Sequence, residues 1–336
     1  MPERNALPRQ ARSLFLKSKK DSLKESSYRA YRFPTKHFIQ YLESENIVNI
    51  REVDGYVIEN WKLTRKADGI APATFKSNVK HAAVFVRWCE RTNLVETGVG
   101  DQIVIPNIAI EDEASHKTVS KKRAEDILRY LEKFEYGTRQ HAIFYFLWQT
   151  GCRISGAITL DLDDFHPTES KIEFRDRKTS ETALKNGSRG ERNVTLTDDL
   201  IRVLSDYIDI SRDDVRDEYD RRPLFTTGSG RIRRQVVYKN VVGFTRPCVY
   251  DGGCPHNREI ENCDAAQNKK KGYECPGSIS MHPIRRGSIT NHLNQGWPKE
   301  KVSERCDVSV SILEKHYNEQ SKEDERQTRR KFLDRL

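Results

Sequence analysis

The chain has no long apolar run, which excludes a membrane-spanning helix. Its richest apolar stretch, residues 142–148, covers about two helical turns, whereas a spanning helix needs roughly 18–20 residues. The first 20 residues are polar and basic and lack the apolar segment of a secretory signal, so we expect an intracellular protein. Hydrophobic residues make up only 36% of the chain, but 13 Phe, 13 Tyr and 4 Trp provide enough buried surface to exclude full disorder.

Charge of one sign is in excess. The 336 residues include 59 Lys and Arg against 50 Asp and Glu, which gives a net charge of +9. Residues 1–100 alone contain 18 basic and 11 acidic side chains, a local net charge of +7. This asymmetry favours an anionic partner, nucleic acid first, because phosphates attract clustered Lys and Arg.

The length and the apolar spacing predict two domains. Helical periodicity runs through residues 21–97, and Pro72 suits the first turn of a helix. Glycine, proline and an acidic run then mark residues 98–118 as a linker. We therefore expect a helical domain at 1–97 and a second domain at 119–336.

The second domain has a mixed pattern. Two short strand-like runs, 171–175 and 192–196, are joined by a long hairpin that contains Gly and Ser. Helices are expected at residues 121–134, 140–149, 198–210, 281–293, 299–306, 309–316 and 321–336. The fold class is therefore mainly α, with an α+β second domain that contains a small β-hairpin or sheet.

Four segments of the second domain carry side chains suited to phosphate chemistry. Each has an ordinary explanation taken alone: a surface salt bridge, a pair on one helix face, or a packed tyrosine. Their order and spacing together are much harder to obtain by chance. They are residues 150–155 with Arg153, the hairpin with Lys178 and Lys185, residues 282–287 with His282 and Arg285, and the pair His316–Tyr317.

With these motifs in this order, the chain resembles the tyrosine recombinases, the phage-integrase family, over nearly its whole length. It most resembles the integrases of haloarchaea and their viruses, which share the Gly-Cys-Arg-Ile run, the Leu-Lys-Asn-Gly hairpin and a Cys-rich insert before His-Pro-x-x-Arg. The resemblance implies a helical, SAM-like core-binding domain that clamps DNA, followed by an α+β catalytic domain. The basic composition contrasts with the acidic chains usual in such hosts.

The resemblance also implies roles for the two arginines and the tyrosine. Arg153 and Arg285 would bind the non-bridging oxygens of the scissile phosphate, because a planar guanidinium can hold two oxygens and stays charged. Tyr317 would be the nucleophile and form a 3′-phosphotyrosine. This covalent linkage conserves the energy of the broken bond, so neither ATP nor a catalytic metal is required.

The proton-transfer residues follow from the same resemblance. His282 would contact the phosphate or assist proton transfer. A lysine of the hairpin would protonate the leaving 5′-oxygen. Lys185 matches the family pattern best, and Lys178 is the competing choice.

The sequence departs from the family pattern at two positions. Many members have a Glu three residues after the first arginine, where this chain has Gly156, so support for Arg153 must come from elsewhere. The family also has a His or Trp nine residues before the nucleophile, where this chain has Val308. His316 and Trp297 are candidates for that role.

Four of the seven cysteines fall within 28 residues. An odd total without an export signal argues against a disulfide framework. Cys248, Cys254, Cys263 and Cys275 have the chemistry of a structural zinc site, with His256 as an alternative ligand, and free buried thiols are the ordinary alternative. We expect a structural zinc in the loop 248–275.

These features predict a site-specific DNA recombinase, an integrase of a viral or mobile element. Its partners would be double-stranded DNA attachment sites, a homo-tetramer assembled on two sites and a possible directionality factor, with no membrane. It would act in the cytoplasm at the nucleoid. The alternatives are a type IB topoisomerase and a catalytically silent DNA-binding accessory protein.

Overall fold

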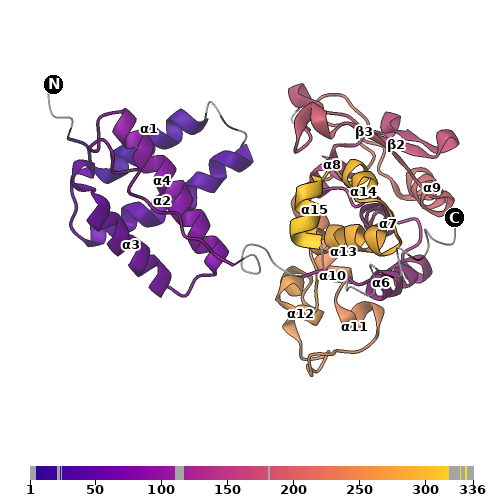
Figure 1. Cartoon of the computed structure of the whole chain (residues 1–336). Coiled ribbons are helices and arrows are strands. Elements are labelled where there is room, and N and C mark those ends of the chain that lie inside the picture. The colour runs from indigo at the N-terminus through magenta and orange to yellow at the C-terminus, as the bar shows by residue number, and fades with distance from the viewer. Residues whose placement is uncertain are drawn as a thin grey trace. The chain divides into compact units, whose positions relative to one another are not determined.

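The computed structural model describes residues 5–20, 23, 25–109, 117–180, 182–317, 326 and 330, without the side chains of Glu25, Ser26, Lys269, His316 and Tyr317. The chain divides into two compact units, Met1–His116 and Lys117–Leu336 (Figure 1). Both units are mainly helical and the second contains small antiparallel sheets, which confirms the expected fold class. In the described part of the chain, no helix is both long and apolar enough to span a bilayer.

Helices build the first unit. They are α1 (Pro8–Lys20), α2 (Glu25–Ser44), the 3₁₀ turn η1 (Ile50–Glu52), α3 (Gly55–Ala67) and α4 (Pro72–Arg91). The Asp54 carboxylate accepts a hydrogen bond from the backbone N–H of Val57 and caps α3, while Pro72 occupies the start of α4. The core is aromatic, with edge-to-face contacts among Phe15, Phe38, Trp61, Phe85 and Trp88.

Two features of the first unit differ from the sequence-based expectation. Helix α1 precedes the predicted helical range, because its many basic residues hide the buried side formed by Ala11 and Phe15. Val99 and Ile103 lie within the predicted linker range, yet both are buried in the core of the first unit. The first unit therefore continues beyond residue 97.

The second unit alternates helices with short strands. Its helices are α6 (Lys121–Phe134), α7 (Arg139–Thr150), α8 (Ile154–Thr159), α9 (Asp198–Asp206), α10 (Arg234–Phe244), α11 (Pro247–Tyr250), α12 (Asp264–Gln267), α13 (Met281–Asn294), α14 (Lys299–Cys306) and α15 (Val310–Tyr317). Its strands are β1 (Phe165–His166), β2 (Lys171–Phe174), β3 (Arg192–Thr195), β4 (Thr226–Thr227) and β5 (Gly230–Arg231). A π-helical turn, Tyr207–Ser211, extends α9. The helix predicted at 321–336 falls outside the described residues except for Arg326 and Arg330.

Helix α7 forms the centre of the second unit (Figure 1). It is apolar on most of its faces, so it can be stable only where neighbouring elements cover it. Phe146 packs against Phe174 and Phe225, with ring centroids 6.3 and 5.8 Å away. The end of α7 is therefore held rigidly, and the chain leaves it directly into the segment that contains Arg153.

The predicted strand pair is present as part of a three-stranded antiparallel sheet in the order β1-β2-β3. Ile172 pairs with Val194 and Phe174 with Arg192. Ile172 and Phe174 alternate with partly exposed residues along β2 and point into the core. The Arg192 guanidinium stacks over the Phe174 ring, 4.0 Å from its centroid. The long connection from β2 to β3 is the hairpin that carries the candidate lysines.

Candidate active site

A left-handed glycine brings the first candidate arginine to its place. Gly151 (φ 59°) ends α7, and its N–H donates to the Leu147 carbonyl. A Cβ atom at this position would lie 2.7 Å from the Cys306 sulfur, so only glycine lets this turn approach α14 so closely. Arg153 follows two residues later as the N-cap of α8.

The second candidate arginine lies beside the same turn. Arg285 is in the second turn of α13 and is only 5% exposed. Its Nη1 donates to the carbonyl oxygens of Gly151 and Cys306, each 2.6 Å away. A buried guanidinium needs such acceptors. The ends of α7 and α14 thus hold Arg285 in place.

Asp307 links the two arginines. Its carbonyl oxygen accepts hydrogen bonds from Arg153 Nη1 at 2.6 Å and from Arg285 Nη2 at 3.3 Å. Its carboxylate also pairs with Arg153 Nη1 at 2.6 Å. The structure therefore brings Arg153 and Arg285 together from elements that are far apart in the sequence.

His282 precedes Arg285 by three residues on α13, so the two share one face of the helix. The residue is exposed at the surface, but its ring is partly desolvated. This desolvation, and then the positive charges of Arg286, Arg285, Arg153 and Arg234, lower the pKa of His282 below 6.5. The imidazole is therefore neutral at pH 7 and can accept a proton.

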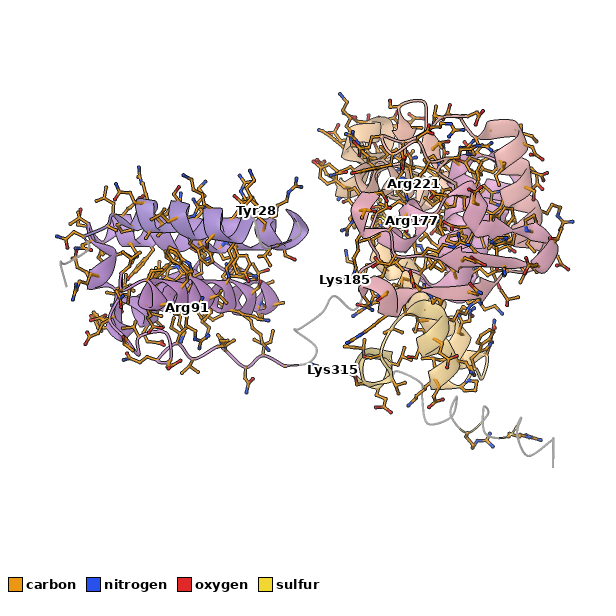
Figure 2. All side chains as sticks on the ribbon, turned by 90° about the horizontal axis from the view of Figure 1, so that it is seen from above. Tyr28, Arg91, Arg177, Lys185, Arg221 and Lys315 are labelled. Carbon is orange, nitrogen blue, oxygen red and sulfur yellow. The ribbon has the colours of Figure 1, made fainter. Side chains whose placement is uncertain are left out.

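The two candidate lysines differ in their surroundings. Lys185 is exposed on the surface of the second unit (Figure 2). Its neighbour Asn186 donates from Nδ2 to the Asp307 carboxylate at 2.7 Å, which connects this part of the hairpin to the arginines. Lys178 is also exposed, but its Nζ lies 3.8 Å from the carboxylate of Asp176. Lys185 stays the predicted proton donor, with Lys178 as the alternative.

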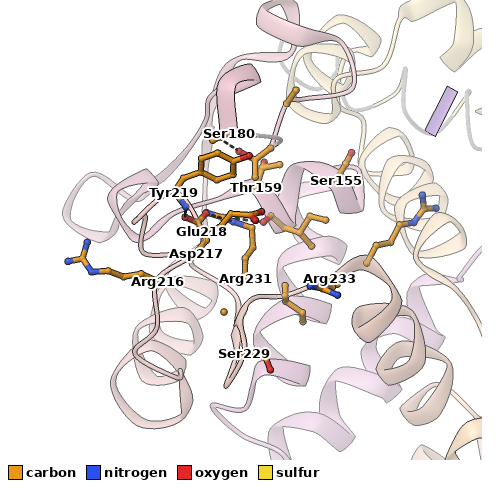
Figure 3. A pocket seen from close by; sticks show the side chains of 16 residues that line it. Ser155, Thr159, Ser180, Arg216, Asp217, Glu218, Tyr219, Ser229, Arg231 and Arg233 are labelled. Carbon is orange, nitrogen blue, oxygen red and sulfur yellow. Dashed lines mark hydrogen bonds and ion pairs between the residues drawn. The ribbon is translucent and has the colours of Figure 1, made fainter. Parts of the chain in front are cut away.

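A network of ion pairs anchors the start of the hairpin. Arg177, Arg221 and Arg231 all pair with Asp161, and the first two lie side by side in Figure 2. Arg231 also pairs with Asp217 at one wall of a cavity of about 440 Å³ (Figure 3). Burial would raise the pKa of Asp217, but hydrogen bonds from Arg231 and from backbone N–H groups lower it to about 2. Asp217 therefore stays ionised at neutral pH, and the ion-pair network fixes the hairpin to the core.

Helix α15 carries the candidate nucleophile. It is anchored by Leu313, which is buried in a small apolar cluster with Val308 and with residues of α13 and α14 such as Ile289. Val308, at the position of the family's His or Trp, therefore serves packing. Tyr317 is the last residue of α15. Its side chain and that of His316 are not among those that the structure describes.

Sequence reasoning missed three polar residues near the candidate site: Asp307, Asn186 and Arg234. Asp307 and Asn186 stand next to residues that the motifs singled out, which was the only signal available. Trp297, proposed for the missing role, packs edge to face against His292, with 5.1 Å between the ring centroids.

The four clustered cysteines line one small cavity. Cys248, Cys254, Cys263 and Cys275 surround about 10 Å³, which is close to the space needed for one water molecule. Arg246 donates to the backbone carbonyls of residues 265 and 266 and fixes the loop around this cavity. Within the described residues, however, no three His, Cys, Asp or Glu side chains stand in an arrangement that could hold a metal ion. The expected zinc is therefore not shown.

Comparisons with known proteins also relate the chain to DNA recombinases. No family model matches the chain. A probable integrase/recombinase protein of Methanocaldococcus jannaschii is 26% identical over 167 residues, which are 49% of this chain and 41% of that protein. The matched part thus spans less than half of the length of this curated relative.

Two solved structures extend the likeness to nearly the whole chain. The Tn1549 transposon integrase in complex with a circular intermediate DNA has a TM-score of 0.68 and 13% identity, covering 98% of this chain and all of that one. The XerH site-specific recombinase bound to its difH substrate has a TM-score of 0.64 and 16% identity, covering 96% and 84%. The chain has the fold of the tyrosine recombinases, and the expected resemblance is confirmed at this level.

Proposed function

We propose that this chain is a tyrosine-type site-specific DNA recombinase. It would break and rejoin duplex DNA through a 3′-phosphotyrosine and so integrate or excise a viral or mobile element. One observation carries the proposal: Arg153 and Arg285, from two distant motifs, meet at the Asp307 carbonyl oxygen. Two guanidinium groups at one point suit the charge that develops on a phosphate under attack.

The proposed cleavage step uses the residues of the two motifs and the hairpin. The Tyr317 oxygen attacks the scissile phosphorus, a new P–O bond forms to the tyrosine, and the bond to the 5′-oxygen breaks. The phenolic proton passes to neutral His282, and Lys185 gives a proton to the leaving 5′-oxygen. Arg153 and Arg285 hold the non-bridging oxygens. The reverse reaction, with a 5′-hydroxyl from another strand, rejoins the DNA.

The fold and the charge support DNA as the partner. The basic first unit would bind phosphates along a duplex attachment site, with strong dependence on salt concentration. The Tn1549 integrase and XerH are both seen with DNA. We further propose a homo-tetramer on two sites, a directionality factor that selects excision, and action at the nucleoid. The archaeal origin of the curated relative supports an archaeal virus or mobile element as the source.

A recombination assay tests this function. Two plasmids, each with the DNA sequence that flanks the gene, are incubated with the protein without ATP and without added Mg²⁺. A cointegrate that depends on both copies of the sequence is the expected product. Relaxation of a supercoiled plasmid that lacks the sequence, without a cointegrate, would instead indicate a type IB topoisomerase. Binding without any strand cleavage would indicate an accessory protein.

We also propose that Cys248, Cys254, Cys263 and Cys275 bind a structural zinc, with His256 as an alternative ligand. Four thiols around a cavity of single-ion size have the donor chemistry of a tetrahedral zinc site. The cysteine side chains would have to rearrange to bind the ion, because in their present arrangement they do not form a ligand set among the described residues. The bound ion would fix the loop that precedes α13 and thereby the helix of His282.

Metal analysis of the purified protein tests this site. One zinc per chain is expected, with loss of the metal and a lower melting temperature in Cys254→Ser and Cys263→Ser. Cys89→Ala, which alters a buried thiol in the first unit, is the matched control and should keep the metal. A wild-type protein without stoichiometric metal, whose melting temperature is unaffected by chelators, would contradict the proposal.

A further inference from the structure

Asp307 occupies a special backbone position at the end of α14. It has φ 53° and ψ 60°, the left-handed conformation, and its N–H donates to the Ser303 carbonyl. Among residues with a side chain, Asp and Asn tolerate this conformation best. The turn ends α14 and directs the Asp307 side chain toward residues of the candidate site.

The Asp307 carboxylate bridges an arginine and the hairpin. Oδ2 accepts from Arg153 Nη1 at 2.6 Å, and Oδ1 accepts from Asn186 Nδ2 at 2.7 Å. The Asp307 side chain is 16% exposed and that of Arg153 is 31% exposed, so the pair is partly shielded from water. Shielding strengthens a charge-assisted hydrogen bond relative to one in open solvent.

The contact engages only one edge of Arg153. Nη1 makes both bonds to Asp307, whereas Nε and Nη2 donate to no acceptor among the residues that the structure describes. A guanidinium has five N–H donors, so this geometry leaves one edge available for phosphate oxygens. The carboxylate orients the group without occupying the edge that would bind DNA.

Position 156, where many tyrosine recombinases have a glutamate, cannot supply this carboxylate because it is a glycine in this chain. Gly156, three residues after Arg153, is buried, and a Cβ atom there would lie 3.3 Å from the ring of Phe174. Phe174 cannot easily give way, because it is 1% exposed and the Arg192 guanidinium stacks on it. At this distance the Phe174 ring would have to shift by a few tenths of an ångström to admit a side chain at position 156.

We propose that Asp307 is the positioning residue of Arg153 and supplies, from the turn after α14, the carboxylate that position 156 lacks. Its charge holds the guanidinium in the orientation that binds the scissile phosphate. Its bond to Asn186 keeps the hairpin of Lys185 at the same point. The inference rests on the proposed function, since it assigns a role within that reaction.

A double-mutant cycle tests the inference. Asp307→Asn keeps the size and the left-handed preference of the residue but removes its charge. In single-turnover cleavage of a nicked duplex that carries the attachment sequence, we expect a rate about 10- to 100-fold lower, the effect of one charge-assisted hydrogen bond. The dissociation constant for the DNA and the melting temperature should stay close to the wild-type values.

The cycle uses Arg153→Lys as its second member. If Asp307 acts through Arg153, Asp307→Asn should cause little further loss in the Arg153→Lys background, because the two residues work as a unit. If the double variant instead lost cleavage rate by the product of the two single losses, the positioning role would be contradicted. So would cleavage by Asp307→Asn at the wild-type rate.

A variant in which the carboxylate is moved from position 307 to position 186 separates two roles of Asp307: orienting Arg153 and holding the hairpin. The double variant Asn186→Asp/Asp307→Asn restores the amide–carboxylate bond but moves the charge to the hairpin, away from Arg153. We expect it to remain slow. Recovery of the wild-type rate would mean that Asp307 only ties the hairpin, and would overturn the inference. A wild-type protein that forms no covalent adduct would instead overturn the proposed function, and the role of Asp307 with it.

Discussion

Arg285 donates a hydrogen bond from Nη1 to the carbonyl oxygen of Gly151 at 2.6 Å, across 134 residues of sequence. Gly151 lies two residues before Arg153, so this contact fixes the turn that carries one candidate arginine against the helix that carries the other. Arg285 is therefore part of the folded core as well as a candidate catalytic residue. Arg153 is more exposed, and its hydrogen bonds within the described part of the chain go to Asp307 alone.

The two arginines should differ in their effect on stability. Arg285→Ala removes the donor for the buried carbonyls of Gly151 and Cys306, so we expect the free energy of unfolding to fall by roughly 2–4 kcal/mol. Arg153→Ala removes a partly exposed ion pair and should cost about 1 kcal/mol or less. Urea denaturation of both variants provides the comparison. Equal losses would mean that the buried hydrogen bonds of Arg285 do not stabilise the protein.

Both arginine variants should lose cleavage activity to a similar extent. Each guanidinium stabilises charge on the attacked phosphate, so we expect rates about 10²–10³-fold lower in single-turnover cleavage of a nicked duplex. The assay is run under conditions in which the urea denaturation curve shows that each variant is folded. A folded Arg153→Ala protein with wild-type cleavage would exclude Arg153 from the site.

Lys185→Ala should slow cleavage by about 10²-fold, because the leaving 5′-oxygen would lose its proton donor. Lys178→Ala is the matched control on the same hairpin and should change the rate little. A substrate with sulfur in place of the 5′-oxygen leaves as a thiolate and needs no proton, so it should restore cleavage by Lys185→Ala. Loss of activity in Lys178→Ala alone, with rescue by the sulfur substrate, would assign the role to Lys178.

His141 should make the protein less stable in mild acid. It is 2% exposed beside Tyr136 and Tyr145, and burial lowers its pKa to about 4. The unfolded chain takes up a proton near pH 6.5 and the folded chain does not, so stability is full above pH 6.5 and falls as the pH drops toward 4. Between pH 7.5 and pH 5, wild type should lose roughly 1–2 kcal/mol more than His141→Phe.

Denaturation curves of wild type and His141→Phe at the two pH values measure this difference. Other histidines contribute equally to both proteins, and His292, whose pKa is also lowered by burial, is one of them. The difference between the two proteins therefore isolates His141. Parallel pH dependences would show that His141 titrates normally in the folded chain.

Much of the fold could be predicted from local patterns. Helix α6 has the bounds that the apolar spacing gave, and α14 matches as well, because each buries one stripe of side chains at helical spacing. Helix α1 was missed because its charged residues dominate its composition. The burial of Val99 and Ile103 could not be foreseen either, since it depends on the surface that the other helices of the first unit present.

The candidate site was predictable only where its residues form motifs. Arg153 and Arg285 were identified by their place in runs of sequence, and the structure brings them together. Asp307 was missed because it belongs to no motif and its partners Arg153 and Asn186 are 154 and 121 residues away. Contacts of this kind arise from tertiary packing, and a single sequence contains no local signal for them.

The most direct test of the account concerns Tyr317. Wild type and Tyr317→Phe are incubated side by side with a nicked duplex, built from the DNA that flanks the gene, in which cleavage releases a short fragment. The account predicts a covalent protein–DNA adduct, joined through the 3′-phosphate, for the wild type only, with equal DNA binding by both proteins. An adduct formed by both proteins would place the nucleophile elsewhere and contradict the central claim.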